Sequence, residues 1–170
     1  MQEHLCSCLL GQLAEMPIFL RRTLAGLPRA ALLRQPENDK SPLLEHLWHT
    51  LDCDTDLYGL RIRRILAEDR PVLEPIDVGA WPEARAYTSR DGDAAIAEFE
   101  QHRAVLIAEL EALEPERLAR VGVRADGSEI SALGVVEQLA AHDQDHRWRV
   151  TAILREFAGL GAQRPELQSP

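Results

Sequence analysis

Apolar residues recur every three or four positions along four long stretches of the sequence, which is the spacing of one face of an α-helix. The first stretch covers residues 2–27, and Pro17 inside it predicts a kink, because its ring clashes with the carbonyl four residues earlier. The second stretch begins at Pro42, a proline in the first helical position with Ser41 as the N-cap, and reaches Asp69. The pattern therefore predicts two long helices joined by a polar linker.

A long, irregular connection and a third helix follow. Several prolines from Pro71 onward predict an extended crossing that reaches Arg90. Asp91 is a suitable N-cap for the next helix, which is expected to run to Pro115. One face of this helix, read as ordinary core, consists of Ile96, Phe99, Arg103, Leu106, Leu110 and Leu113.

The last part of the chain predicts a small hairpin and a fourth helix. The dipeptide Asp126-Gly127 is a strong turn signal. Ser131 is a suitable N-cap, and the helix after it is expected to end near Gly159. Two histidines belong to its apolar stripe. The stripe consists of Val135, Leu139, His142, His146, Val150, Ile153 and Phe157.

Four helices with long connections describe an all-α protein, a four-helix bundle whose functional sites are usually built in its interior. The chain has 170 residues, of which 45% are hydrophobic and 5% aromatic, which suits a single helical domain and disfavours an all-β fold. We expect one domain over residues 1–160 and a frayed tail over 161–170.

The charge and the cysteine content limit the classes of binding partner and the cellular compartment that are expected. The 28 acidic residues exceed the 19 basic ones and give a formal charge of −9, which repels nucleic acids and anionic membranes. No apolar run approaches the length of about 20 residues that crosses a bilayer, and no secretory signal is recognisable. The chain has three cysteines, Cys6, Cys8 and Cys53. An odd number fits a reducing compartment, where no disulfide is expected. We therefore expect a soluble, cytoplasmic protein that binds neither nucleic acid nor membranes.

Two histidines of the fourth helix are candidate metal ligands. His142 and His146 lie four residues apart, so that both imidazoles can reach one cation, and both fall within the apolar stripe. A divalent cation would satisfy two buried acceptor nitrogens at once. The alternative is a pair of core histidines bonded to backbone carbonyls, and the spacing alone does not decide between them.

The second helix adds a third histidine. Opposite its main apolar stripe runs another, with His46, His49, Cys53, Leu57 and Leu60. A helix buried on two faces lies between partners, either a neighbouring helix or a second subunit, so a homodimer is expected. On this second stripe His49 can complete a three-imidazole site with the pair on the last helix.

Three motifs together resemble the DinB-like family of helical-bundle proteins. They are the run Ser41-Pro-Leu-Leu-Glu-His-Leu-Trp-His-Thr-Leu-Asp52, the run Arg61-Ile-Arg-Arg-Ile-Leu-Ala-Glu-Asp-Arg-Pro71 with Asp77 and Trp81 after it, and His142-Asp-Gln-Asp-His146. The resemblance implies an up-down-down-up bundle, commonly dimeric. It also implies one metal, bound by His49, His142 and His146.

Some positions depart from the family pattern. His46 stands where relatives usually have an aliphatic residue, so it is left out of the ligand set. Lys40 stands where tryptophan is frequent, and Arg147-Trp148-Arg149 replaces smaller or polar residues. These changes leave the implied ligands intact but alter the substrate pocket.

Three neutral imidazoles leave a divalent cation its full charge, so it can activate water or a thiol. The resembled family includes transferases and isomerases that use low-molecular-weight thiols, and members described as metal-dependent hydrolases. We therefore expect a metal-dependent thiol S-transferase or hydrolase acting on a small electrophile. Zinc, nickel, iron and copper all suit imidazole ligands.

For three other side chains near the histidines, the sequence allows more than one role. Glu45 and Asp145 are candidates for a general base or for orienting the ligands, although solvated carboxylates are the more common case. Cys53 can be a fourth ligand, a redox-sensitive thiol or, most simply, a packing residue. The alternative to an enzyme is a non-catalytic metal- or ligand-binding stress-response module, whose metal site a fourth protein ligand would close. A metal-free helical dimer is a further alternative.

Overall fold

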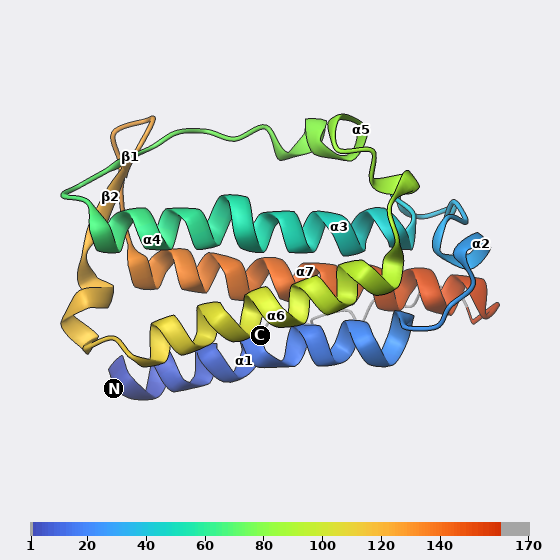
Figure 1. Ribbon diagram of the computed structural model, residues 1–170, viewed down its shortest axis with the longest axis horizontal. Coiled ribbons are helices and arrows are strands. Elements are labelled where there is room, and N and C mark those ends of the chain that lie inside the picture. The colour runs from blue at the N-terminus through green and yellow to red at the C-terminus, as the bar shows by residue number, and fades with distance from the viewer. Residues whose placement is uncertain (1, 161–170) are drawn as a thin grey trace, which may run out of the picture.

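The computed structural model describes residues 2–160. The tail expected over residues 161–170 lies outside this range. Within it, four long helical segments lie side by side (Figure 1): α1 (Gln2–Leu24), α3 with α4 (Leu43–Cys53 and Leu60–Ala67), α6 (Gly92–Glu111) and α7 (Ala132–Phe157). The first and last run in one direction and the other two in the opposite one, so the up-down-down-up order implied by the resemblance is confirmed.

The second long helix is interrupted. A π-helical segment, Asp54–Gly59, joins α3 to α4, whereas the sequence predicted one continuous helix. A Cβ on Gly59 would lie 2.4 Å from the carbonyl oxygen of Asp54, so the segment admits no side chain at that point. The N-cap of α3 is Pro42 without a side-chain hydrogen bond, so the expected capping by Ser41 is wrong.

The connection after α4 contains only short elements: β1 (Val72–Leu73), a 3₁₀ turn (Val78–Ala80), α5 (Trp81–Ala84) and a second 3₁₀ turn (Tyr87–Ser89). It is anchored to α3 through one carboxylate. Tyr87 donates a 2.6 Å hydrogen bond from its hydroxyl to Asp52 Oδ2, and Arg85 Nη1 lies 2.7 Å from the same atom. These contacts hold the predicted irregular crossing against the bundle.

A small sheet closes one end of the bundle. The predicted hairpin is confirmed as β2 (Val121–Arg124) and β3 (Glu129–Ser131), with Gly127 at φ +83° in its turn. The sequence did not predict that β1 would pair in parallel with β2. Ser131 caps α7 by accepting a 3.0 Å hydrogen bond from Gly134 N, as expected.

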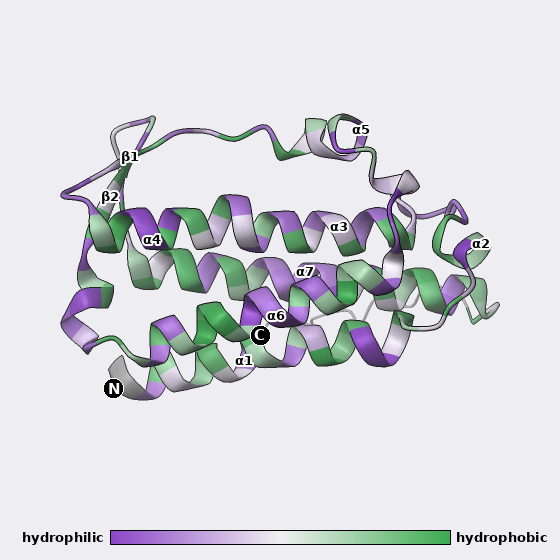
Figure 2. Ribbon diagram, in the orientation of Figure 1, coloured by the Kyte–Doolittle hydropathy of each residue, from purple (hydrophilic) through white to green (hydrophobic). Residues whose placement is uncertain are grey.

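Each long helix carries both apolar and polar residues (Figure 2), and the apolar ones form two buried clusters. One contains Trp48 and Phe99, and the other contains Ile62 and Leu106. Between them on α6 lies Arg103, a fully buried cation in the stripe that the sequence suggested was ordinary core. The core is therefore divided by a polar layer.

The second stripe of α3 is covered by the chain itself. His46 and Cys53 are 4% and 1% exposed, and only Leu60 at its far end is 44% exposed. Both α7 and the connection pack against α3. Two-sided burial of this helix therefore needs no second subunit, and the homodimer stays a prediction. Among the described helices, none is both long and apolar enough to span a membrane.

Candidate metal site

Side chains of α3 and α7 bring potential metal ligands together inside the bundle. His49 and Cys53 lie one turn apart on α3, and His142 lies on α7. The Nε2 atoms of His49 and His142 are 3.4 Å apart, and Cys53 Sγ lies 3.4 Å from His49 Nε2. Among the described residues, one donor atom from each of these three lies within 4.8 Å of the other two.

These separations fit a tetrahedral cation. Metal–nitrogen bonds of about 2.05 Å and a metal–sulfur bond of about 2.3 Å give tetrahedral edges of about 3.3 Å between nitrogens and about 3.6 Å between nitrogen and sulfur. The observed edges at His49 Nε2 are both 3.4 Å. In addition, His142 Nδ1 is buried and has no hydrogen-bond partner within residues 2–160, so no strong bond from this part of the chain fixes the ring in another role.

His146, the third ligand implied by the resemblance, lies beside this group. Its ring centre is 4.4 Å from that of His142 and 5.1 Å from that of His49. It does not belong to the set with mutual separations under 4.8 Å, in which Cys53 stands instead. The Nδ1 atom of His146 lies 3.0 Å from His46 Nδ1.

The structure brings His46 into the site, although the sequence analysis left it out. His46 Nε2 lies 3.4 Å from Asp39 Oδ1, so the ring stands between a carboxylate and His146. The available signal was its place on the second stripe of α3, which marks it as buried. The partnership with Asp39 and His146 joins three separate segments and has no local signature in the sequence.

Burial dominates the electrostatics of the cluster. Together with a smaller effect of neighbouring His49, it lowers the pKa of His142 to about 4. Burial also lowers the pKa values of His46, His49 and His146. The imidazoles are therefore neutral at pH 7 and keep the lone pairs that a metal needs. For Cys53, burial and the charge of Asp52 raise the pKa to about 12, so without a metal it is a thiol.

A pocket of about 640 Å³ opens onto the histidines from one side. Its polar walls include Glu45, His46, His49, Asp145, His146 and Arg149. Glu45 is half-buried and has no ion-pair partner among the described residues, whereas Asp145 accepts a 2.7 Å hydrogen bond from Arg149 Nε. Both predicted carboxylates therefore line the pocket, but Asp145 is already paired.

A buried ion triad supports the cluster from the other side. Arg103 Nη1 donates to Asp143 Oδ2 at 2.6 Å and to the carbonyl of Leu13 at 2.8 Å, and Arg103 Nε donates to Asp54 Oδ1 at 3.0 Å. Asp54 directly follows Cys53, and Asp143 directly follows His142. One guanidinium of α6 thus ties α1, α7 and the π-helical segment together at the level of the cluster.

Comparison with known proteins agrees with this architecture. The family model of the DinB superfamily matches residues 12–150. The chain belongs to the DinB superfamily. No functionally curated protein matches the sequence significantly.

A solved structure shares the DinB fold of this chain. YfiT from Bacillus subtilis, described as a probable metal-dependent hydrolase with an unusual four-helix bundle topology, matches with a TM-score of 0.82 and 19% sequence identity. The match covers 90% of this chain and 87% of YfiT. At this identity the likeness establishes the fold. The bundle that the sequence predicts is therefore confirmed as a DinB-like one.

Proposed function

We propose that this DinB-superfamily protein is a divalent-metal enzyme in which His49, His142 and His146 hold the metal. A small thiol or a water molecule attacks a small electrophilic substrate in the adjoining pocket. The observation that carries the proposal is the 3.4 Å approach of His49 Nε2 to His142 Nε2, which matches a tetrahedral edge, with His49 itself lining a pocket of about 640 Å³. The description of YfiT as a probable metal-dependent hydrolase favours the same class of function.

The metal supplies Lewis acidity, which polarises an electrophile and lowers the pKa of a bound water or thiol. The chain's own residues keep the ligands neutral and shape the approach of the substrate. Glu45 forms no ion pair with the rest of the described chain and lies on the pocket wall one turn before His49, so it is the better placed of the two carboxylates to accept the proton of the attacking group. Asp145, held by Arg149, serves to fix that arginine. Zinc, nickel and iron suit the imidazole ligands.

The test combines metal analysis with a reactivity screen. Protein loaded with zinc, nickel or iron is assayed with small thiols and electrophiles, and with esters and amides as the hydrolytic arm. We expect one equivalent of metal, lost in His142→Ala and His146→Ala and kept in His102→Ala, a variant of an exposed histidine. Turnover that survives complete removal of the metal would contradict the proposal, and so would equal trace metal in all four proteins.

The position of Cys53 favours a second candidate, a non-catalytic metal site. Its sulfur is 3.4 Å from His49 Nε2, so with three histidines it would complete four protein ligands and close the coordination sphere. The two candidates differ in access for added ligands. In the cobalt-substituted protein, an open site changes its visible absorption when a small thiol or azide is added, whereas a closed site does not.

A further inference from the structure

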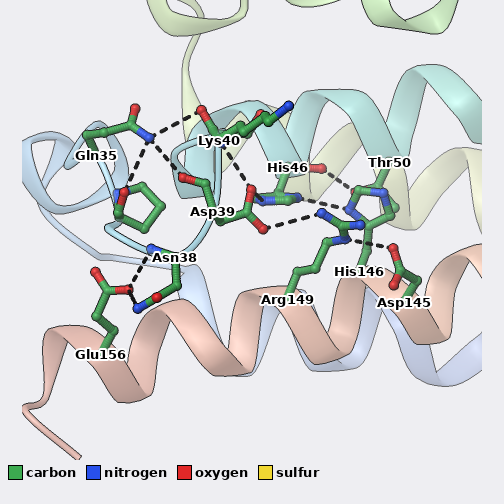
Figure 3. A network of polar contacts seen from close by, with 12 residues as sticks. Gln35, Asn38, Asp39, Lys40, His46, Thr50, Asp145, His146, Arg149 and Glu156 are labelled. Atoms are coloured by element: carbon green, nitrogen blue, oxygen red, sulfur yellow. Dashed lines mark hydrogen bonds and ion pairs between the residues drawn. The ribbon is translucent and has the colours of Figure 1, made fainter. Parts of the chain in front are cut away.

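Contacts among three side chains, Asp39, His46 and His146, link the loop before α3 to α7 (Figure 3). Asp39 Oδ1 lies 3.4 Å from His46 Nε2, and His46 Nδ1 lies 3.0 Å from His146 Nδ1. The side chain of Asp39 is 11% exposed, and His46 and His146 are 4% and 8% exposed. Since His46 lies outside the ligand set that the family resemblance implies, the contacts of this ring require an explanation of their own.

The carboxylate of Asp39 is held in place by a backbone amide and an arginine. Its Oδ1 accepts a 3.0 Å hydrogen bond from Ser41 N, and its Oδ2 lies 3.5 Å from Arg149 Nη1. Arg149 is in turn fixed by Asp145 on the same helix. An ionised carboxylate with a cation and a backbone donor beside it can only accept hydrogen bonds. The negative charge of Asp39, 3.4 Å from His46 Nε2, therefore favours a proton on that nitrogen by electrostatic attraction, since Nε2 makes no hydrogen bond to any of the described residues.

The position of the proton on His46 determines the position of the proton on His146. Buried imidazoles are most stable in the neutral form, which carries one proton on one of its two nitrogens. With its proton on Nε2, His46 presents a lone pair at Nδ1, so the bond between the two rings is donated by His146 Nδ1. The remaining nitrogen of His146, Nε2, then carries the lone pair. This is the tautomer that a metal ligand bound through Nε2 requires.

We propose that Asp39 and His46 are positioning residues that fix the orientation and the tautomer of His146, and so prepare its Nε2 as a metal ligand. The inference rests on the proposed metal site. Histidines that bind metals commonly donate their other ring nitrogen to a carboxylate or carbonyl, and loss of such a partner costs about 10- to 100-fold in metal affinity. Here the partner is a second imidazole, which is itself oriented by a carboxylate.

The test uses matched substitutions at His46. His46→Phe keeps a ring but removes both nitrogens. His46→Asn places an amide oxygen near the position of Nδ1 and can still accept from His146. Metal affinity, measured by competition with a chromophoric chelator, should fall about 10- to 100-fold in His46→Phe and less than about threefold in His46→Asn.

Asp39→Asn and Glu156→Gln form a second pair. An asparagine at position 39 can still accept from Ser41 N but loses the charge, so metal affinity should fall by about tenfold. Glu156 anchors the same loop through Glu37 N and Asn38, away from His46. Glu156→Gln therefore controls for loosening of the loop and should leave the affinity unchanged.

A direct readout is the tautomer of His146 in the metal-free wild type, from ¹⁵N chemical shifts of its ring. We expect the proton on Nδ1, and a mixture of tautomers in His46→Phe. A proton on Nε2 in the wild type, or wild-type affinity in both His46→Phe and Asp39→Asn, would overturn the positioning role while leaving the metal site in place. Failure of the wild type to bind metal would instead overturn the proposed function. The wild-type spectrum and Asp39→Asn keep the test decisive if His46→Phe does not fold.

Discussion

One nitrogen is the geometric centre of the candidate site. His49 Nε2 lies 3.4 Å from both Cys53 Sγ and His142 Nε2. Without a metal, this nitrogen carries either one proton or one lone pair, so it can make only one well-aligned hydrogen bond with its two neighbours. A cation bound by His49 Nε2 and His142 Nε2 would replace this competition with metal–ligand bonds, and in the closed, non-catalytic alternative Cys53 Sγ would be a further ligand.

The first prediction at the residue scale concerns the reactivity of Cys53. Alkylation requires the thiolate, and burial raises the pKa of this thiol to about 12 while leaving it 1% exposed. In the folded, metal-free protein, Cys53 should react with iodoacetamide at pH 8 at least ~100-fold more slowly than exposed Cys8, since each pKa unit lowers the thiolate fraction about tenfold. Peptide mass spectrometry over a time course measures both rates. Equal rates would show that the thiol is activated.

The second prediction concerns the pH dependence of metal binding. Only neutral imidazole binds a metal, and a lowered pKa keeps the ring neutral to a lower pH. Three ordinary histidines with pKa values of about 6.5 would weaken binding by about a thousandfold between pH 7.5 and 5.5. Because burial lowers the pKa of His142 to about 4 and also lowers those of His49 and His146, the loss should be less than about tenfold. Chelator competition at both pH values measures it, and a thousandfold loss would contradict the burial of the site.

Sequence periodicity was sufficient to place some site residues but not others. His49, His142 and His146 could be found because a period of 3.6 residues assigns each to an inward face. Asp39 and His46 could not be linked in this way, since their contact depends on how a linker folds back over α3. The sequence favours a packing role for Cys53, because predicted burial alone does not distinguish a core thiol from a thiol beside an imidazole nitrogen.

At the scale of elements, a buried charge couples the helices around the site. Arg103 occupies the apolar stripe of α6, and no local pattern reveals that Asp54 and Asp143 meet it there. The π-helical segment Asp54–Gly59 was equally hidden, because it is a short, wider turn between two stretches that each keep helical periodicity. It nevertheless determines where the carboxylate of Asp54 lies.

Removing this guanidinium should destabilise the whole bundle. Arg103→Met leaves two buried carboxylates without their partner, which costs about 3–5 kcal/mol in the free energy of unfolding. Burial already raises the pKa of Asp143 to about 6 against the effect of Arg103, so Asp143 should take up a proton when the arginine is lost. Urea denaturation at pH 7 measures the change.

An exposed ion pair of α4 and α6 provides the matched comparison. Arg63 Nε donates to Glu109 Oε2 at 2.9 Å, and both side chains are 44% exposed. Arg63→Met should cost less than about 1 kcal/mol, because solvent screens such pairs. Equal losses in the two variants would mean that the buried triad contributes no more than a surface pair.

At the scale of the whole molecule, the order and direction of the helices were predictable from the sequence. The sheet at the end of the bundle and the segment that covers α3 were not. Turn signals such as Asp126-Gly127 and caps such as Asp91 and Ser131 act over a few residues, so sequence reasoning found them. The parallel pairing of β1 with β2 joins segments about 50 positions apart and carries no such signal. The covering of α3 by the connection is of the same long-range kind, and it depends on Asp52, Arg85 and Tyr87.

The metal should stabilise the native bundle by mass action, because its ligands come together only on folding. His49 and His142 are 93 residues apart and lie on different helices, so the unfolded chain cannot bind with comparable affinity. Each tenfold increase in free zinc above the dissociation constant should add about 1.4 kcal/mol and raise the unfolding temperature by about 3–5 °C. Calorimetry over a series of buffered zinc concentrations measures the slope. His142→Ala should abolish it, magnesium should not reproduce it, and a slope retained in His142→Ala would place the stabilising metal elsewhere.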